Sequence, residues 1–85
     1  MTIPVEVKIY SRADCHLCED AKATIERVAD EVDTAVTIEE IDVDTDETLR
    51  AEYGDRVPYV FVDGWPAFKY EVDADELRRQ LQDAA

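Results

Sequence analysis

The two cysteines of this chain are three residues apart, in Cys15-His16-Leu17-Cys18, and this spacing limits the fold more than any other feature. They follow the run Val5–Tyr10, which alternates as a strand does, and they precede a run with helical periodicity. Thiols at such a junction share the first turn of a helix, where unpaired backbone N–H groups and the macrodipole favour a thiolate. Positions i and i+3 of that turn also bring two sulfur atoms within bridging range. The pattern therefore predicts a dithiol that opens and closes one disulfide.

The remaining sequence predicts strands and helices in the order βαβαββα. A right-handed βαβ unit joined to a ββα hairpin unit makes an α/β fold, with one mixed four-stranded sheet and helices on both faces. The expected elements are the strand Ile3–Tyr10, a helix with its core stripe at Leu17, Ala21, Ile25, Val28 and Val32, the strand Val36–Val43, a short helix around Leu49 and Tyr53, the strands Tyr59–Val62 and Ala67–Tyr70, and a helix around Leu77 and Leu81.

Local signals mark the ends of several of these elements. The runs Asp44–Glu47 and Asp73–Glu76 both have the pattern of a capping box before a helix. Gly54 is placed to end the second helix in the left-handed conformation. Asp63-Gly64 predicts a tight hairpin between the third and fourth strands.

The charge of the chain restricts its partners. It has 22 acidic and 9 basic residues and a formal net charge of −13. Nucleic acids and anionic membranes reward Lys and Arg, so neither is an expected partner. Because the acids are spread along the whole chain, they favour a hydrated surface suited to concentrated salt, as in a halophilic protein. The alternative is that the acids steer the protein to a basic partner.

Length and cysteine usage predict one small cytoplasmic domain. At 85 residues the chain has room for a single domain, residues 1–85, which we expect to be monomeric. No apolar stretch approaches the ~20 residues that span a bilayer, and the N-terminus lacks the pattern of a secretory signal. One close pair of cysteines fits a reducing cytoplasm better than a secreted scaffold.

Two motifs together resemble the glutaredoxin-like branch of the thioredoxin superfamily. They are Ile9–Cys18, which contains the cysteine pair, and Val57–Gly64, which begins with a Val-Pro step. The resemblance covers nearly the whole chain in element order, and the acidic composition suggests a haloarchaeal member. It implies a dithiol-disulfide oxidoreductase, in which Cys15 is the attacking thiol and Cys18 the resolving thiol.

The resemblance also implies roles for residues around the cysteines. Arg12 matches a basic position that contacts a substrate carboxylate, although a plain surface arginine is the alternative. Val57-Pro58 matches a cis-proline step whose preceding backbone pairs with an extended substrate. His16 either assists proton transfer and tunes the reduction potential or is an exposed spacer, and both interpretations stay open.

One departure from the family bears on the substrate. Glutaredoxins that use glutathione usually have a Gly-Gly pair after the hairpin, where this chain has Phe68-Lys69-Tyr70. We therefore expect a disulfide-containing protein or a low-molecular-weight thiol as substrate, and a reductase or small thiol as electron donor. No cofactor is expected.

The strongest alternative function is a metal-binding or metal-carrying module that uses the cysteine pair. A structural zinc site needs four ligands, whereas Cys15, Cys18 and His16 supply at most three, so no metal is expected within one chain. Small copper carriers follow a βαββαβ order and lack the Val-Pro step. A third possibility is a redox-inactive relative that acts only in protein interaction. The presence of both cysteines argues against it.

Overall fold

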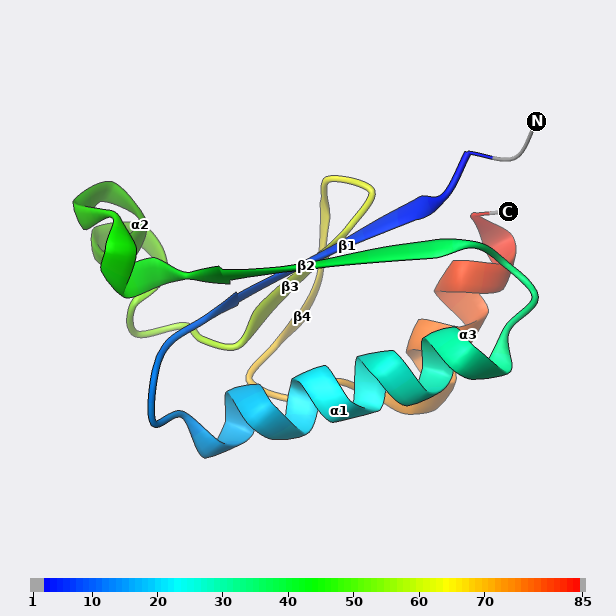
Figure 1. The fold of residues 1–85 in the computed structure, drawn as a ribbon, viewed down its shortest axis with the longest axis horizontal. Helices are drawn as coiled ribbons and strands as arrows, with labels where there is room; N and C mark the ends of the chain where they lie inside the picture. The colour runs from blue at the N-terminus through cyan, green and yellow to red at the C-terminus, as the bar shows by residue number, and fades with distance from the viewer. Residues whose placement is uncertain (1–2, 85) are drawn as a thin grey trace.

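The first strand, β1 (Val5–Ser11), is paired on both sides, and the rest of the sheet is arranged around it (Figure 1). The computed structural model describes residues 3–84. β2 (Val36–Asp42) is parallel to β1, whereas β3 (Tyr59–Val62) is antiparallel to β1 and pairs with the antiparallel β4 (Trp65–Lys69). The strand order β2-β1-β3-β4 makes the mixed four-stranded sheet that the sequence predicts.

Helices lie on both faces of this sheet, which confirms the predicted α/β architecture. α1 (His16–Glu31) and α3 (Ala74–Asp83) pack against each other below the sheet in the view of Figure 1. After β2 the chain forms a 3-10 turn, η1 (Val43–Thr45), and then the short helix α2 (Glu47–Tyr53) near the end of β2.

The core lies between the sheet and the pair α1 and α3. Alternation along β1 buries Val5, Val7 and Ile9 on this side and leaves Glu6 and Lys8 exposed on the other. Burial of apolar surface, at roughly 25 cal/mol per Å², is the main force that holds the layers together. The other strands and helices contribute Ile25, Val28, Val60, Val62, Leu77 and Leu81 to this core.

One residue of the predicted helical stripe is exposed. Leu17 is 45 % exposed, whereas Ala21, Ile25 and Val28 are buried as expected. The buried line of α1 begins at Cys18, and its steps of three and four residues then reach Ala21, Ile25 and Val28. Leu17 precedes Cys18 by one residue, a rotation of about 100° around the helix axis, and therefore points elsewhere. The expectation that Leu17 belongs to the core was wrong.

The opposite face of the sheet carries a cluster of four aromatic rings. Tyr53 of α2 stacks on Tyr10 of β1 with 4.4 Å between ring centroids, and Tyr59 stacks on Phe61 in β3 at 4.9 Å. The two pairs meet edge to face, an arrangement that aromatic rings prefer. Desolvation, together with the neighbouring Glu52 carboxylate, raises the pKa of the Tyr53 phenol above its ordinary value.

The hairpin between β3 and β4 has the predicted turn. Asp63 and Gly64 both have positive φ, 49° and 83°, as a type I′ turn requires. The twist of this turn matches the twist of the paired strands. The Asp63 carboxylate also accepts the backbone N–H of Glu6 at 2.9 Å, which places the turn beside the start of β1. Trp65 follows the turn and is 75 % exposed.

Several element ends differ from the prediction. Asp73 caps α3 as expected, since its carboxylate accepts the N–H groups two and three residues later. α2 is capped by Asp46 instead of Asp44, because Val43 leaves β2 and begins η1. β4 begins at Trp65, earlier than predicted, and ends before Tyr70, whose φ of 71° leaves the strand conformation.

Gly54 ends α2 in a different way from the one predicted. Its φ and ψ are −53° and −35°, so it is right-handed and not left-handed. Its N–H donates to the Arg50 carbonyl at 2.9 Å, and a Cβ at Gly54 would lie 2.5 Å from that oxygen. A close approach to backbone is therefore the reason for glycine here.

The two glycines provide a matched test of this interpretation. We expect Gly54→Ala to lower the free energy of unfolding by about 2 kcal/mol, because the added methyl group overpacks a backbone contact. Gly64→Ala meets open space and should cost about 1 kcal/mol through its positive φ alone. Urea unfolding measures both. A neutral or stabilising Gly54→Ala substitution, as helix propensity alone predicts, would contradict the proposed clash.

Carboxylates dominate the surface charge. The chain has 22 acidic side chains and only 9 basic ones. One of the basic side chains, Arg78, binds both Glu31 and Asp75. These two hydrogen bonds raise the pKa of the Arg78 guanidinium. Most carboxylates must therefore repel one another at low ionic strength, which opposes the compact state.

This repulsion predicts a stabilising effect of salt. The Debye length falls from about 10 Å at 0.1 M to about 3 Å at 1 M salt. We therefore expect the unfolding temperature to rise markedly between dilute buffer and molar potassium chloride. Calorimetry with sucrose in place of salt controls for solute exclusion, which also stabilises proteins. A flat or falling temperature in potassium chloride would remove the support for a halophilic protein.

Candidate functional site

The two cysteines lie where β1 passes into α1. Between Ser11 and the helix, Asp14 turns the chain with a φ of 56°, a left-handed conformation that Asp tolerates better than most residues. Cys15 is extended, with φ −104° and ψ 104°, and is the N-cap of α1. Cys18 is therefore in the first turn of the helix, as the sequence predicts.

The cysteines form a disulfide, with 5.2 Å between their Cα atoms. The N–H of Cys18 donates to the Cys15 sulfur at 3.2 Å, so this sulfur takes the place of the oxygen of a common N-cap residue. When the bridge is reduced, this donor and the helix dipole favour a thiolate at Cys15. Cys18 is only 2 % exposed, whereas Cys15 is partly exposed. One sulfur is therefore accessible and the other is shielded.

The Val57–Pro58 peptide bond is cis, as the resemblance predicts. Pro58 immediately precedes β3, and Tyr59 pairs with Tyr10 near the end of β1. The proline step therefore lies at the end of the sheet from which the cysteine loop starts. The Pro58 carbonyl accepts the N–H of Tyr70 at 2.8 Å, which brings the segment after β4 to the same place.

Arg12 is held by two neighbours in the structure. Its Nε and Nη2 bind the Asp44 carboxylate at 3.2 and 2.9 Å, and its Nη1 donates to the Gly54 carbonyl at 3.1 Å. Two parallel bonds of this kind fix the orientation of the guanidinium against the carboxylate. These bonds attach η1 and the end of α2 to the loop before the cysteines. Contact between Arg12 and a substrate carboxylate stays a prediction.

His16 lies on the exposed side of the first turn. Its Nε2 is 3.4 Å from the Asp20 carboxylate, one turn further along α1, and its side chain is 84 % exposed. Both interpretations of His16 therefore stay open.

Sequence reasoning missed a polar cluster beside the disulfide. A cavity of about 360 Å³ is lined by both cysteines and by Ser11, Lys22 and Glu40. The buried Ser11 hydroxyl donates to the Glu40 carboxylate at 3.3 Å, and Lys22 Nζ lies 3.4 Å from the same group. The position of Lys22, one helical turn after Cys18, was the available signal. Glu40 could not be found without the register of β2, which pairs it with Ile9.

Metal-binding clusters and membrane-spanning helices are both absent from residues 3–84. No group of three or more His, Cys, Asp and Glu side chains in this range is arranged to hold a metal ion. Every helix in the same range is too short or too polar to cross a membrane.

Comparison with known proteins places the chain in a family. Residues 6–82 match the family described as Glutaredoxin-like domain (DUF836). The chain belongs to this glutaredoxin-like family. A glutaredoxin-like protein of Dictyostelium discoideum is 31 % identical over 82 residues, which cover 92 % of this chain and 76 % of the relative.

Solved structures agree with this assignment. The protein Ne2328 of Nitrosomonas europaea has a TM-score of 0.77 and 29 % identity, with 95 % of each chain covered. A mutant thioredoxin of Halobacterium salinarum NRC-1 has a TM-score of 0.61 and 27 % identity, covering 93 % of this chain and 73 % of the thioredoxin. A glutaredoxin-like protein with a thioredoxin fold and the pair Cys15 and Cys18 has the features of a redox protein.

Proposed function

We propose that this glutaredoxin-like protein is a dithiol-disulfide oxidoreductase that exchanges electrons with protein or small-molecule disulfides. The observation that carries the proposal is the asymmetry of the pair at the start of α1. Cys15 is partly exposed and its sulfur accepts a backbone N–H, while Cys18 is buried in the same turn. An accessible, stabilised thiolate next to a shielded thiol is suited to sequential attack.

The exchange moves two electrons in two steps. The Cys15 thiolate attacks one sulfur of the substrate disulfide, forming a mixed disulfide, and the other substrate sulfur leaves as a thiolate that takes a proton from water. Cys18 then loses its proton and attacks the Cys15 sulfur. This step forms the Cys15–Cys18 bridge and releases the second substrate sulfur as a thiolate. The substrate is reduced and the protein oxidised, and a reductase or small thiol restores the dithiol.

Neighbouring residues position the substrate in this proposal. The backbone of Val57, before cis Pro58, pairs with an extended segment on one side of the target disulfide. Arg12, which also binds the Asp44 carboxylate, contacts a carboxylate of the substrate. Each chain carries out the reaction without a cofactor, and the reducing cytoplasm supplies the electrons.

The cysteine roles can be separated by substitution. Cys18→Ser should trap a mixed disulfide with a substrate at Cys15, because the resolving thiol is absent. Cys15→Ser should abolish exchange, because the remaining thiol is shielded. Mass spectrometry of trapped adducts and an insulin reduction assay measure the two effects. If Cys15→Ser reduced disulfides at the wild-type rate, the roles would be assigned wrongly.

Glutathione is expected to be a poor donor. It is anionic, and the acidic residues Asp14, Glu19 and Asp20 flank the cysteine pair in the sequence. The bulky Tyr70 also occupies the region where glutathione-using relatives have glycine. We expect weak turnover with glutathione alone and clearly faster turnover with a dithiol reagent or an enzymatic reductase. Saturable glutathione-dependent reduction in moderate salt, lost in Arg12→Glu, would instead indicate a conventional glutaredoxin.

A further inference from the structure

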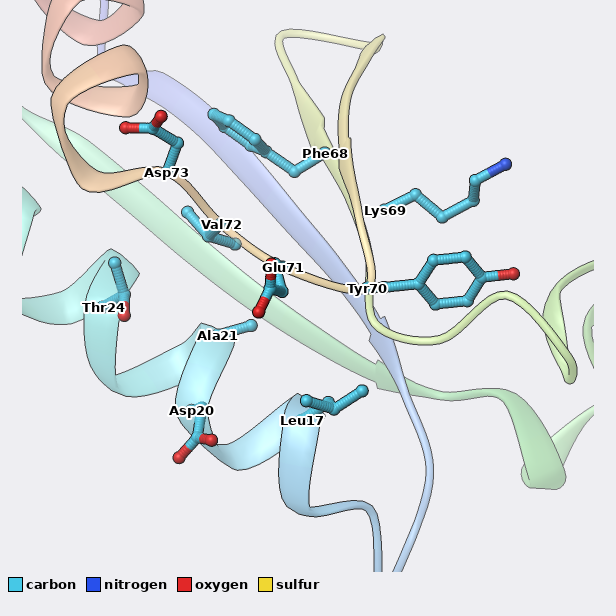
Figure 2. A pocket seen from close by; sticks show the side chains of 10 residues that line it. All are labelled: Leu17, Asp20, Ala21, Thr24, Phe68, Lys69, Tyr70, Glu71, Val72 and Asp73. Carbon is cyan, nitrogen blue, oxygen red and sulfur yellow. The ribbon is translucent and has the colours of Figure 1, made fainter.

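Three basic side chains belong to residues that line the two cavities next to the cysteine pair. Arg12 and Lys22 line the cavity of about 360 Å³ that both cysteines border. Lys69 lines a second cavity, between the first turns of α1 and the segment that joins β4 to α3 (Figure 2). These cations are the groups that could draw an anionic substrate toward the sulfur atoms.

Two of the three cations are not available to such a substrate. Lys22 Nζ lies 3.4 Å from the Glu40 carboxylate. In Figure 2 the Lys69 side chain points away from α1, and its Nζ lies 5.7 Å from the centre of the Tyr70 ring. The binding of an anionic substrate therefore depends on Arg12, in the loop before the cysteines.

Arg12 is occupied by a carboxylate of the chain itself. Two donors of its guanidinium bind the Asp44 carboxylate in parallel, Nε at 3.2 Å and Nη2 at 2.9 Å. Arginine binds a free carboxylate in the same bidentate geometry. A third donor, on Nη1, binds the Gly54 carbonyl. A substrate carboxylate can therefore take the bidentate position on Arg12 only by displacing Asp44.

Asp44 is kept in this position by bonds within its own turn. Its backbone N–H donates to the Asp42 carboxylate at 2.9 Å, and the Thr45 hydroxyl donates to the Asp42 carbonyl at 2.7 Å. Neither bond involves Arg12. A displaced Asp44 carboxylate would therefore remain beside the incoming one, and like charges repel.

The ion pair is exposed enough to open. The side chain of Arg12 is 37 % exposed and that of Asp44 is 34 % exposed. Ion pairs that water reaches contribute little to stability. Asp44 is therefore an exchangeable competitor for Arg12 and not a permanent block.

We propose that Asp44 sets the substrate preference of the exchange reaction by occupying Arg12. A disulfide with a carboxylate near its sulfur atoms must compete with Asp44 for the guanidinium, whereas a neutral disulfide meets no such competitor. Asp44 thus selects against small disulfides that carry carboxylates and in favour of neutral ones. This inference rests on the proposed oxidoreductase function. It makes Asp44 a residue that acts through Arg12 without touching the substrate.

Two nearly isosteric disulfides, dithiodipropionate and its diamide, test this preference. Reduced protein is freed of reductant and mixed with each disulfide. Alkylation stops the reaction, and mass spectrometry gives the rate at which the Cys15–Cys18 bridge forms. We expect Asp44→Asn to raise the ratio of the dithiodipropionate rate to the diamide rate about fivefold, because the charge that competes for Arg12 is removed. The diamide rate should change by no more than about twofold.

Three further variants separate this effect from net charge and from loop structure. Glu39→Gln removes one negative charge on β2, outside the contact with Arg12, and should leave the ratio near that of the wild type. Asp44→Glu keeps a carboxylate and should restore most of the wild-type ratio. Arg12→Gln combined with Asp44→Asn should lose the gain, because the gain comes from the released guanidinium. Circular dichroism establishes that each variant is folded.

A purely structural role of the ion pair predicts a different pattern. If the pair only held the loop, Asp44→Asn would change the rates with both disulfides alike, and the inference would be overturned. An equal gain in Glu39→Gln would also overturn it, and so would a gain that survives when Arg12→Gln is added.

Alkylation of Cys15 distinguishes failure of this inference from failure of the proposed function, because it needs no disulfide exchange. Iodoacetate and iodoacetamide differ in the same way as the two disulfides, a carboxylate against an amide. A higher ratio of iodoacetate to iodoacetamide rates in Asp44→Asn, with neither disulfide reduced by the protein, would support the competition for Arg12 and reject the oxidoreductase. Exchange with both disulfides at a ratio that Asp44→Asn leaves unchanged would reject the role of Asp44 alone.

Discussion

The pairing of β1 with a neighbour on each side is the constraint on which the site depends. Because β1 is parallel to β2 and antiparallel to β3, the end of β1, the end of β2 and the start of β3 all meet at one edge. That edge holds the cysteine loop, η1 with its Arg12 contact, and the Val57–Pro58 step. A shift of register by one residue would turn Val7 and Ile9 out of the core and would separate these three parts.

Features that depend on a few neighbouring residues could be predicted from the sequence. The cysteine spacing, the Asp63-Gly64 turn and the Asp73 cap depend on local backbone geometry, and the structure confirms all three. The left-handed conformation predicted for Gly54 was wrong. A glycine at the end of a helix can be required either by a left-handed conformation or by a close backbone contact, and only the distance to the Arg50 carbonyl distinguishes the two. Local pattern alone could not decide this case.

The missed parts of the site depend on residues that are distant in sequence. Glu40 reaches Ser11 only through the register between β1 and β2. Leu17 was assigned to the core because a stripe that starts at Leu17 and one that starts at Cys18 share their later positions. Composition gave the acidic character of the surface but not where each carboxylate lies.

The placement of the hairpin determines how the protein can be followed by spectroscopy. The chain has a single tryptophan, Trp65, and the pairing of Trp65 with Val62 and of Val62 with Val7 puts it toward the start of β1. The disulfide lies beyond the other end of that strand. The indole is therefore remote from the sulfur atoms that would quench it, and it is largely in water when the protein is folded. Tryptophan emission is thus a weak reporter of both oxidation and unfolding, whereas the stacked tyrosines on α2 and β1 are better placed to report loss of the native packing.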